Sequence, residues 1–329
     1  MSNLKNYIKK HYHSLLIIAG VLLIVGIAAI IYLRFKGFIN FVTVDKEISD
    51  ESLASYTDNN DILLPLLDKD GYILKRDVEN ILVLGNGPFA DDYGKKNSLA
   101  SMLEKSTGAN VINCALSGTH ATQTDPDNVL TDPLDVYTAY YLLNYMAFPE
   151  AIAENVETAY EMLGDKNPPR AREVLDTLSN LDMSEVQVVV IMYDLTDYYE
   201  NRLVNLDDTE VDEVSFAGSI YRAVNFLNVI YPETRIIVSS PYYNPQKDAS
   251  GEYVSAELVK NDYGTPSNYF YSLGGSIQAV STCSFLDNYF GTVTEDNYSE
   301  YLEKDERHLN KAGKELLTKR LTEFITAFN

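Results

Sequence analysis

Residues 81–92, ILVLGNGPFADD, contain the turn that decides how the chain folds. An apolar run of strand character ends at Gly85, and the tight polar turn Asn86-Gly87-Pro88 follows at once. A continuous apolar strand that leads into a helix is typical of a parallel sheet covered on both faces. In several hydrolase architectures a nucleophilic serine occupies this corner, and here the position holds Gly87.

Four further apolar runs repeat this pattern, with helix-period segments between them. The pattern predicts a three-layer α/β sandwich of the flavodoxin type, with a five-stranded parallel sheet of order 2-1-3-4-5. The helical stretch at 126–182 is too long for an ordinary crossover, and we expect it to be an insertion near the carboxyl edge of the sheet, where ligands bind in such folds. The five predicted strands are ILVLG (81–85), NVINCAL (110–116), VQVVVIMY (186–193), RIIVSS (235–240) and STCSFLD (281–287), and the predicted helices lie near 95–107, 133–147, 150–163, 170–181, 211–231, 267–280 and 310–327.

An uncharged apolar stretch near the N-terminus, residues 15–33, predicts a transmembrane helix. Its nineteen residues would span roughly 28 Å as a helix, close to the thickness of a bilayer core. The stretch is too long for a typical signal-peptide core, and a buried soluble helix is the alternative. Three lysines precede it and two basic residues follow, so the positive-inside rule predicts a cytoplasmic N-terminus and an extracytoplasmic body.

These features predict four parts of the chain. Residues 1–14 form the cytoplasmic N-terminus, and 15–33 form the single-pass anchor in the cell membrane. Residues 34–77 lack sustained periodicity and are interpreted as a stalk plus an entry segment that packs on the edge of the domain. Residues 78–329 form the α/β domain, with the helical insertion at about 126–182.

The charge of the body excludes some partners. The first 36 residues hold five of the 26 basic residues and none of the 48 acidic ones, which leaves 21 basic against 48 acidic residues and a charge of −27. Nucleic acids and anionic lipid surfaces reward basic proteins, so neither is expected to bind the body. The turn GNGPFA lacks the third glycine of a dinucleotide-binding fingerprint, and we expect neither a cofactor nor a metal.

Two cysteines, Cys114 and Cys283, lie in apolar strand-like runs. Buried thiols are common in such positions, and two separate thiols are the favoured interpretation. A single disulfide is the alternative in an extracytoplasmic domain.

Polar residues gather where the predicted strands end, which is where open parallel sheets place their functional sites. The first strand leads into Asn86 and Gly87, and the second into Ser117 and Gly118. The third leads into Asp194-Leu195-Thr196-Asp197, and DERHLN (305–310) precedes the last predicted helix.

These segments, in this order, resemble the motifs of the SGNH/GDSL hydrolase family over roughly residues 78–329. The family has a Gly-Asp-Ser corner, an Asn…Gly loop, a Gly-x-Asn-Asp loop and a final Asp-x-x-His-x-Asn motif. The resemblance implies that Asp305 and His308 form the catalytic dyad and that Gly118 is an oxyanion donor. Gly87 stands where the serine belongs, and Thr196 stands where the oxyanion asparagine belongs.

In this family the serine attacks an acyl carbonyl, histidine takes its proton, and the aspartate holds the imidazole tautomer. Without a hydroxyl at Gly87, covalent acyl transfer is strongly impaired, and we expect a hole of about one hydroxymethyl group beside the imidazole. Other hydroxyls or a water activated by His308 are alternative nucleophiles. The hydroxyl candidates are Ser117, Thr119, Ser239 and Ser240, and further candidate cleft residues are Asn86, Asp194 and Asp197.

Each of these residues also has a purely structural interpretation. Asp305 and His308 could cap the last helix, and Gly87-Pro88 could be a simple tight turn. His120 is expected to be a solvated loop residue rather than part of the cleft. Asp91 and Asp92 are expected to complement the dipole of the next helix. The tyrosines Tyr198 and Tyr199 could line a pocket or cover the sheet.

Two functions therefore stay open. The first is a membrane-anchored, extracytoplasmic hydrolase or acyltransferase that acts on ester-linked acyl groups of cell-envelope glycans. The second is a catalytically degenerate domain that binds an acylated glycan or an envelope protein through the cleft where the family has its active site.

Overall fold

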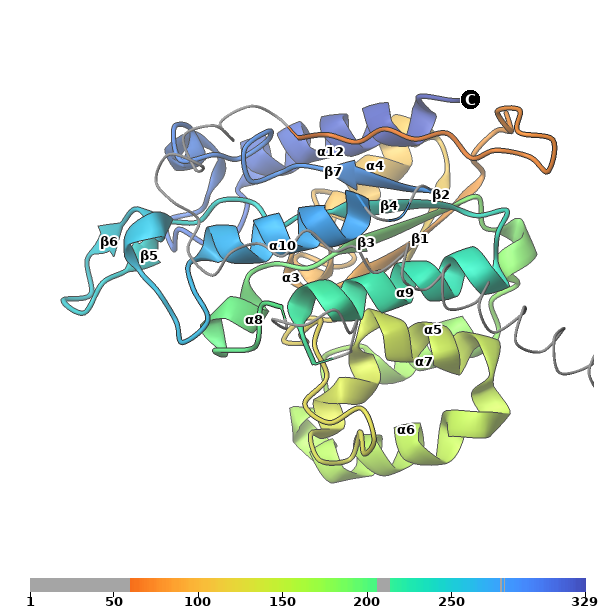
Figure 1. Ribbon diagram of the computed structural model, residues 1–329, viewed down its shortest axis with the longest axis horizontal. Coiled ribbons are helices and arrows are strands. Elements are labelled where there is room, and N and C mark those ends of the chain that lie inside the picture. The colour runs from red at the N-terminus through yellow and green to blue at the C-terminus, as the bar shows by residue number, and fades with distance from the viewer. Residues whose placement is uncertain (1–59, 206–213, 279, 281) are drawn as a thin grey trace, which may run out of the picture. The chain divides into compact units, whose positions relative to one another are not determined.

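A five-stranded parallel sheet forms the centre of the fold (Figure 1). Its strand order, β2-β1-β3-β4-β7, is the predicted 2-1-3-4-5 order, so this prediction is confirmed. The structure is a computed structural model that describes residues 60–205, 214–278, 280 and 282–329. The sheet strands are β1 (Asn80–Gly85), β2 (Asn110–Asn113), β3 (Val188–Met192), β4 (Arg235–Ser239) and β7 (Cys283–Leu286).

The central strands are apolar on both faces because helices cover both faces of the sheet. Every residue of β3 and β4 is buried. Successive strand residues point to opposite faces. Ile81 and Val83 of β1 therefore share one core cluster with Leu103 and Leu321, which come from two of the covering helices.

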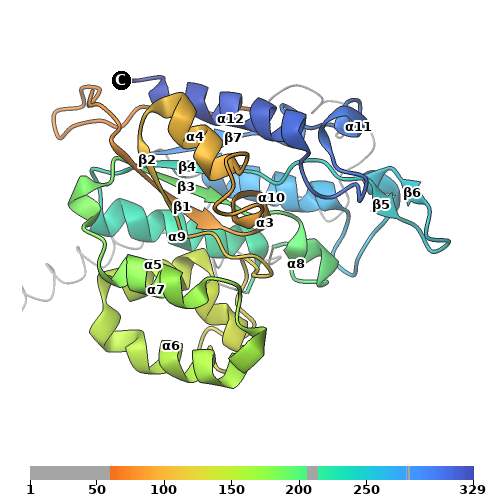
Figure 2. The ribbon, with the colours of Figure 1, turned by 180° about the vertical axis from the view of Figure 1, so that it is seen from behind.

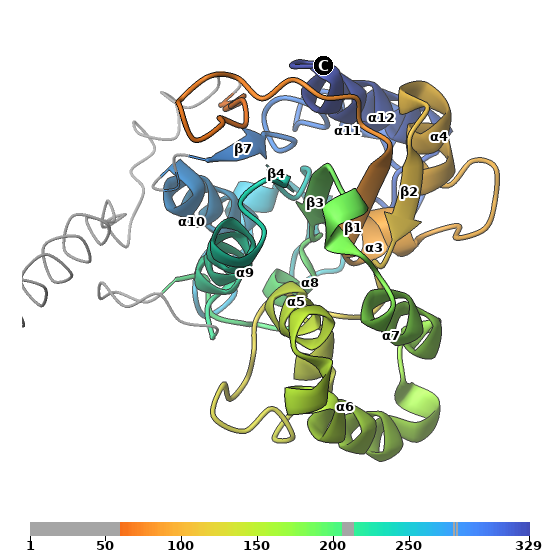
Figure 3. The same ribbon diagram turned by 90° about the vertical axis from the view of Figure 1, so that its right-hand side faces the viewer.

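Helices lie on both sides of the sheet and complete the predicted three layers (Figures 2 and 3). Helices α4 and α12 pack together on one face, and α9 and α10 cover the other. The helices outside the insertion are α3 (Gly87–Ala90), α4 (Leu99–Thr107), α8 (Thr196–Tyr199), α9 (Phe216–Ile230), α10 (Pro266–Gln278), α11 (Tyr298–Tyr301) and α12 (Lys311–Thr326), with the 3-10 turn η4 (Ala256–Leu258).

The predicted insertion at 126–182 consists of helices that extend the layer containing α9. Helix α5 packs against α9, and α6 lies outside α5 and α7 (Figure 3). The insertion reaches the carboxyl edge of the sheet at Arg170, whose guanidinium donates to the carbonyl oxygen of Asn113 at 2.8 Å. Its elements are η1 (Pro133–Tyr137), α5 (Ala139–Ala147), α6 (Pro149–Leu163), η2 (Gly164–Lys166), α7 (Ala171–Ser179) and η3 (Met183–Glu185).

The end of the entry segment packs on the edge of the domain, as expected, because Ile62 and Phe285 exchange backbone hydrogen bonds of 2.9 and 2.8 Å beside β7. One feature differs from the sequence-based expectation. A short hairpin of β5 (Gln246–Lys247) and β6 (Tyr253–Val254) follows β4 and was not predicted. The hairpin projects at the end of the domain where α8 lies (Figure 1).

The predicted transmembrane stretch, 15–33, lies outside the described residues. Within the described ranges, no helix combines the length and apolar character needed to cross a bilayer. Cys114 and Cys283 are both free and buried, which confirms two separate thiols. Burial raises the pKa of each thiol to about 12.

Gly85 allows β1 and β3 to approach closely at their carboxyl ends. Its φ is +141°, and an added Cβ would collide with the carbonyl oxygen of Met192. That carbonyl accepts a 3.2 Å hydrogen bond from the backbone N–H of Asn86. The glycine is therefore required by both backbone conformation and space.

Replacing Gly85 with alanine should lower the free energy of unfolding by more than about 3 kcal/mol, because conformational strain and a backbone collision add together. The matched control is Gly108→Ala. Gly108 also has a positive φ, of 76°, but nothing lies within 4 Å of an added Cβ. The control should cost only about 1–2 kcal/mol. Urea unfolding measures both values, and equal losses would contradict the assigned collision.

Candidate active site

Asn86 joins the loops that follow three strands of the sheet. Its side-chain nitrogen donates to the carbonyl oxygen of Thr119 at 2.9 Å and to Oδ1 of Asp194 at 2.8 Å. Its side-chain oxygen accepts the backbone N–H of Asp194 at 2.8 Å. The expectation that Asn86 lines the cleft is wrong, because this side chain is fully buried. Its hydrogen bonds to Thr119 and Asp194 connect the three loops, and we call this set of contacts the Asn86 brace.

Asp305 and His308 form a hydrogen-bonded pair. Oδ2 of Asp305 lies 2.6 Å from Nδ1 of His308, which leaves Nε2 outside this pair and 3.9 Å from a carboxylate oxygen of Asp91. Oδ1 of Asp305 accepts the backbone N–H groups of Arg307 and His308 at 3.0 and 3.1 Å. Although desolvation opposes it, hydrogen bonding to His308 and these N–H groups lowers the pKa of Asp305 to about 2. The carboxylate therefore stays ionised and orients the half-exposed imidazole.

The capping interpretation of this pair is wrong. Helix α12 begins at Lys311, and its N-cap is Asn310, whose side chain accepts the N–H of Gly313 at 3.0 Å. The loop that carries the pair is fixed from β4 and the hairpin instead. The Tyr242 hydroxyl donates to the carbonyl oxygen of Arg307 at 2.9 Å. The Tyr253 hydroxyl donates to the carbonyl oxygen of Asp305 at 2.7 Å.

The expected hole beside Gly87 is filled by the carboxylate of Asp194. The φ of Gly87 lies outside the left-handed region, so the backbone accepts a side chain there. However, Oδ2 of Asp194 lies 2.8 Å from the position of an added Cβ. The other oxygen of Asp194 is fixed by Asn86 and by the backbone N–H of Thr196, each at 2.8 Å. The prediction of an empty space is therefore wrong.

Asp91 is a cleft residue that sequence reasoning missed. Its carboxylate lies 3.9 Å from Nε2 of His308, and its backbone N–H donates to the carbonyl oxygen of Gly87 at 2.8 Å. Burial raises the pKa of Asp91; His308 opposes this effect and Asp194 adds to it. The sequence did offer one sign of this position, because Asp91 comes one short helical turn after Gly87.

Neither Asp91 nor Asp92 serves the dipole of the next helix. Helix α4 begins at Leu99, and its N-cap is Ser98, which is several residues further along the chain. Asp92 instead pairs with Lys314 at 2.5 Å and with Lys95 at 2.6 Å. These hydrogen bonds lower the pKa of Asp92 to about 2 and connect the turn after α3 to α12.

The predicted oxyanion residues lie on the loops that Asn86 joins. Gly118 is exposed, has a φ of 76° and immediately precedes Thr119, whose carbonyl Asn86 binds. Thr196 begins α8 and is half-buried beside Asp194. The Asn86 brace thus places Gly87, Gly118 and Thr196 on three connected loops at one edge of the sheet.

Most of the alternative hydroxyl nucleophiles are engaged inside the protein. The buried Thr119 hydroxyl donates to the carbonyl oxygen of Leu116 at 2.8 Å. Ser239 and Ser240 are buried and accept hydrogen bonds from Asn288 at 2.7 and 2.9 Å. Ser117 differs from these residues because it is exposed beside Gly118.

Asp197 and His120 lie in a buried charged cluster behind the cleft. Asp197 accepts the backbone N–H groups of Ala121 and Thr122 at 2.9 and 3.1 Å, so its prediction as a cleft residue is wrong. His120 has no exposed surface and is not the expected solvated residue. Although burial lowers it, hydrogen bonding to Asp135 and Glu200 raises the pKa of His120 to about 9.

This cluster also contains a set of donors with metal-like spacing. Ligand atoms of His120, Asp132 and Asp135 lie within 4.8 Å of one another. Arg202 already supplies a cation there, at 3.1 Å from Asp132 and 2.7 Å from Glu200. Since Arg202 and His120 already pair with these carboxylates, we assign the residues to an ion-pair cluster.

Comparison with proteins of known structure identifies the same fold elsewhere. A crystal structure of a Lactobacillus plantarum protein is 13% identical, with a TM-score of 0.52 over 77% of this chain and 99% of that one. A second structure is 16% identical, with a TM-score of 0.52 over 76% and 97% of the two chains. A structure described as a GDSL-like lipase of Bacteroides ovatus is 10% identical, with a TM-score of 0.42 over 77% and 100%. No family model and no curated protein matches the sequence.

Asn86→Asp should destabilise the fold although the side chain keeps its shape. At neutral pH it places a second buried carboxylate against Asp194 and removes two N–H donors, which should cost more than about 2 kcal/mol. The pKa of the introduced carboxyl is raised in the folded state, so the cost should shrink as pH falls through that pKa. Urea unfolding at several pH values tests this, with exposed Asn97→Asp as the control. If Asn86→Asp and Asn97→Asp lowered the free energy of unfolding equally at neutral pH, the assigned role of Asn86 would be refuted.

Proposed function

We propose that this domain is an SGNH/GDSL-type hydrolase domain that removes ester-linked acyl groups from cell-envelope glycans. The observation that carries the proposal is the Asp305–His308 pair, with 2.6 Å between Oδ2 and Nδ1 and with a half-exposed imidazole whose Nε2 lies outside the pair. A carboxylate that fixes one ring nitrogen and leaves the other toward the substrate is the arrangement of a general base. The order of the four segments that resemble the family's motifs supports ester hydrolysis, and the proposed external location supports a glycan of the envelope as the substrate.

The location of the domain belongs to the same proposal. Residues 15–33 anchor the chain in the cell membrane, with residues 1–14 in the cytoplasm and the domain outside. The strong negative charge of the body favours a soluble domain held away from an anionic surface. An outward-facing tethered domain meets glycans of the envelope rather than metabolites of the cytoplasm.

We propose water as the nucleophile, because Gly87 has no hydroxyl. The 3.9 Å separation between Nε2 of His308 and Asp91 is too long for a direct hydrogen bond and suits a water that contacts both. The water oxygen bonds to the acyl carbon while its proton passes to Nε2. The ester C–O bond then breaks, and the imidazolium returns the proton to the leaving sugar oxygen. The N–H groups of Gly87 and Gly118 are the candidate oxyanion donors.

A second candidate is a domain that binds acylated glycan or an envelope protein without turnover. The observation that favours it is the carboxylate of Asp194 beside Gly87. A negative charge in this place repels a developing oxyanion, which the site of a hydrolase must stabilise. The retained pair of Asp305 and His308 favours the first candidate, since binding alone does not need an oriented base.

Hydrolysis of acetylated oligosaccharides by the full-length chain in detergent distinguishes the two candidates. His308→Ala should lower the rate by about 10²- to 10⁴-fold, the usual contribution of a general base. Asp305→Asn should also lower the rate, because the amide no longer fixes the ring tautomer. The matched control is Glu303→Gln, an exposed carboxylate on the same loop.

Turnover that survives His308→Ala unchanged would refute the proposed base. If the wild-type chain binds the acetylated oligosaccharide but releases no acetate, the binding function replaces the hydrolytic one. Equal losses from His308→Ala and Glu303→Gln would point to a folding defect rather than to catalysis.

A further inference from the structure

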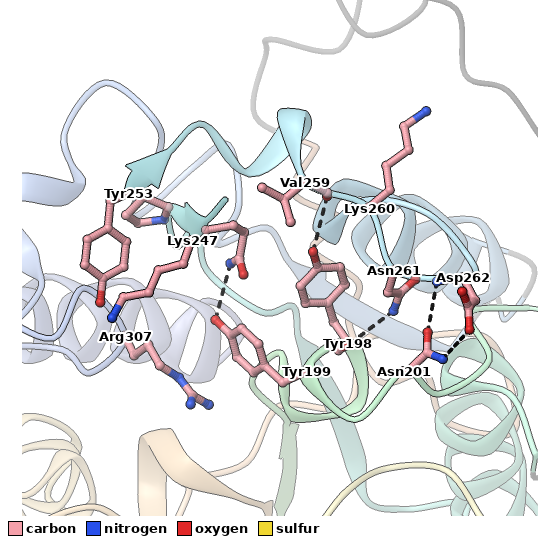
Figure 4. A pocket seen from close by; sticks show the side chains of 12 residues that line it. Tyr198, Tyr199, Asn201, Lys247, Tyr253, Val259, Lys260, Asn261, Asp262 and Arg307 are labelled. Carbon is pink, nitrogen blue, oxygen red and sulfur yellow. Dashed lines mark hydrogen bonds between the residues drawn. The ribbon is translucent and has the colours of Figure 1, made fainter. Parts of the chain in front are cut away.

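A polar groove opens beside the catalytic pair (Figure 4). Its volume is about 680 Å³, and it lies between α8, the β5–β6 hairpin and residues 259–262. Two contacts connect it to the pair. Arg307, which lines the groove, directly precedes His308, and the Tyr253 hydroxyl binds the carbonyl oxygen of Asp305. The groove therefore adjoins the loop that carries the imidazole.

The groove carries cations that the rest of the protein leaves without anions. Within the described part of the chain, no carboxylate lies within ion-pair distance of Lys247 or Arg307, although acidic residues outnumber basic ones by 48 to 26. Several arginines elsewhere in the domain are paired with carboxylates, for example Arg172 with Glu157 at 2.5 Å. In so acidic a chain, two unpaired cations in one groove indicate a place for an external anion.

Aromatic rings hold these cations without neutralising them. The Arg307 guanidinium lies 4.0 Å from the centre of the Tyr199 ring, and the Lys247 ammonium lies 5.0 Å from that of Tyr253. Figure 4 shows Arg307 and Lys247 close together at one end of the groove. Cation–π contacts fix the orientation of a cation and leave its N–H donors available.

The far end of the groove carries one charged residue of each sign, Lys260 and Asp262. Asp262 is the acidic residue in the lining, and its carboxylate accepts a 2.6 Å hydrogen bond from the side chain of Asn201. Amides and tyrosines provide the remaining polar contacts there. Tyrosine combines a flat apolar face with a hydroxyl, which suits a ring or chain that carries many hydroxyl groups.

We propose that this groove binds an anionic carbohydrate, with its carboxylate or phosphate at Arg307 and Lys247 and its neighbouring acylated hydroxyl at His308. The planar fork of the arginine matches both anions. This inference deepens the proposed function, on which the acylated part of the ligand rests. It narrows the substrate class from envelope glycans in general to acidic ones, and it explains why the cations flank the base.

Calorimetric titration of the full-length chain in detergent tests the groove. The probes are a short oligogalacturonate, an oligo(glycerol phosphate) and a neutral galactose oligomer of the same length. An anionic probe should bind at least tenfold more tightly than the neutral one, and added salt should weaken that binding. The anionic probe that binds more tightly identifies the preferred anion as carboxylate or phosphate.

Arg307→Gln should weaken binding of the anionic probe at least tenfold, and Lys247→Gln should weaken it as well. The control is Lys105→Gln on α4, a basic residue of a separate surface, which should leave binding unchanged. Equal affinity for neutral and anionic probes, or no effect of Arg307→Gln, would overturn the proposal. Equal weakening by Lys105→Gln would also overturn it, because the attraction would then be a general effect of charge.

A further variant separates this inference from the proposed hydrolysis. His308→Ala should leave binding of the unacylated anionic probe unchanged while it removes turnover. A chain that binds the probe through Arg307 but hydrolyses no ester would support the proposed anion binding in the groove and contradict the proposed hydrolysis. A chain that hydrolyses esters but shows no preference for anionic probes would contradict the proposed anion binding in the groove and leave the proposed hydrolysis standing.

Discussion

The reciprocal hydrogen bonds between Asn86 and Asp194 are the contact on which the site depends. Each residue donates to the other at 2.8 Å, across the carboxyl ends of two neighbouring strands. The same amide also binds the loop after the second strand. Gly85 makes this approach possible because only glycine fits against the carbonyl of Met192. One buried amide therefore joins three loops, and the loop before α12 brings the Asp305–His308 pair to within 3.9 Å of Asp91 beside them.

The brace also gives a physical reason for the departures from the family motifs. Gly87 stands where the resemblance places a serine, and Asp194 stands where it places the glycine of Gly-x-Asn-Asp. The space that a side chain at residue 87 would fill is occupied by the carboxylate of Asp194. An aspartate at residue 86 would face that carboxylate, whereas Asn86 donates to it. The departures at residues 86, 87 and 194 are thus mutually compatible in space, and a carboxylate lies where a serine side chain would be.

Local sequence predicts the sheet and the catalytic pair because both depend on short-range patterns. Apolar runs mark the five strands, and the spacing of Asp305 and His308 within one loop brings them together. Contacts between distant segments are not visible in this way. The positions of Asp91 and Asp194 depend on how two loops approach, and His120 is buried only because Asp135 and Glu200 reach it from other segments. The β5–β6 hairpin is too short to produce a periodic signal.

The central claim is that His308 is a positioned base and that a hydroxyl at residue 87, with the space to hold it, would restore a nucleophile beside it. Labelling of Gly87→Ser/Asp194→Ala with a fluorophosphonate, read by intact-mass spectrometry, tests this claim most directly. The account predicts a covalent adduct on the introduced serine. It predicts no adduct on the wild-type chain, on Gly87→Ala/Asp194→Ala, or when His308→Ala is added to the serine variant. A folded serine variant that stays unlabelled, or a wild-type chain that is labelled, would contradict it.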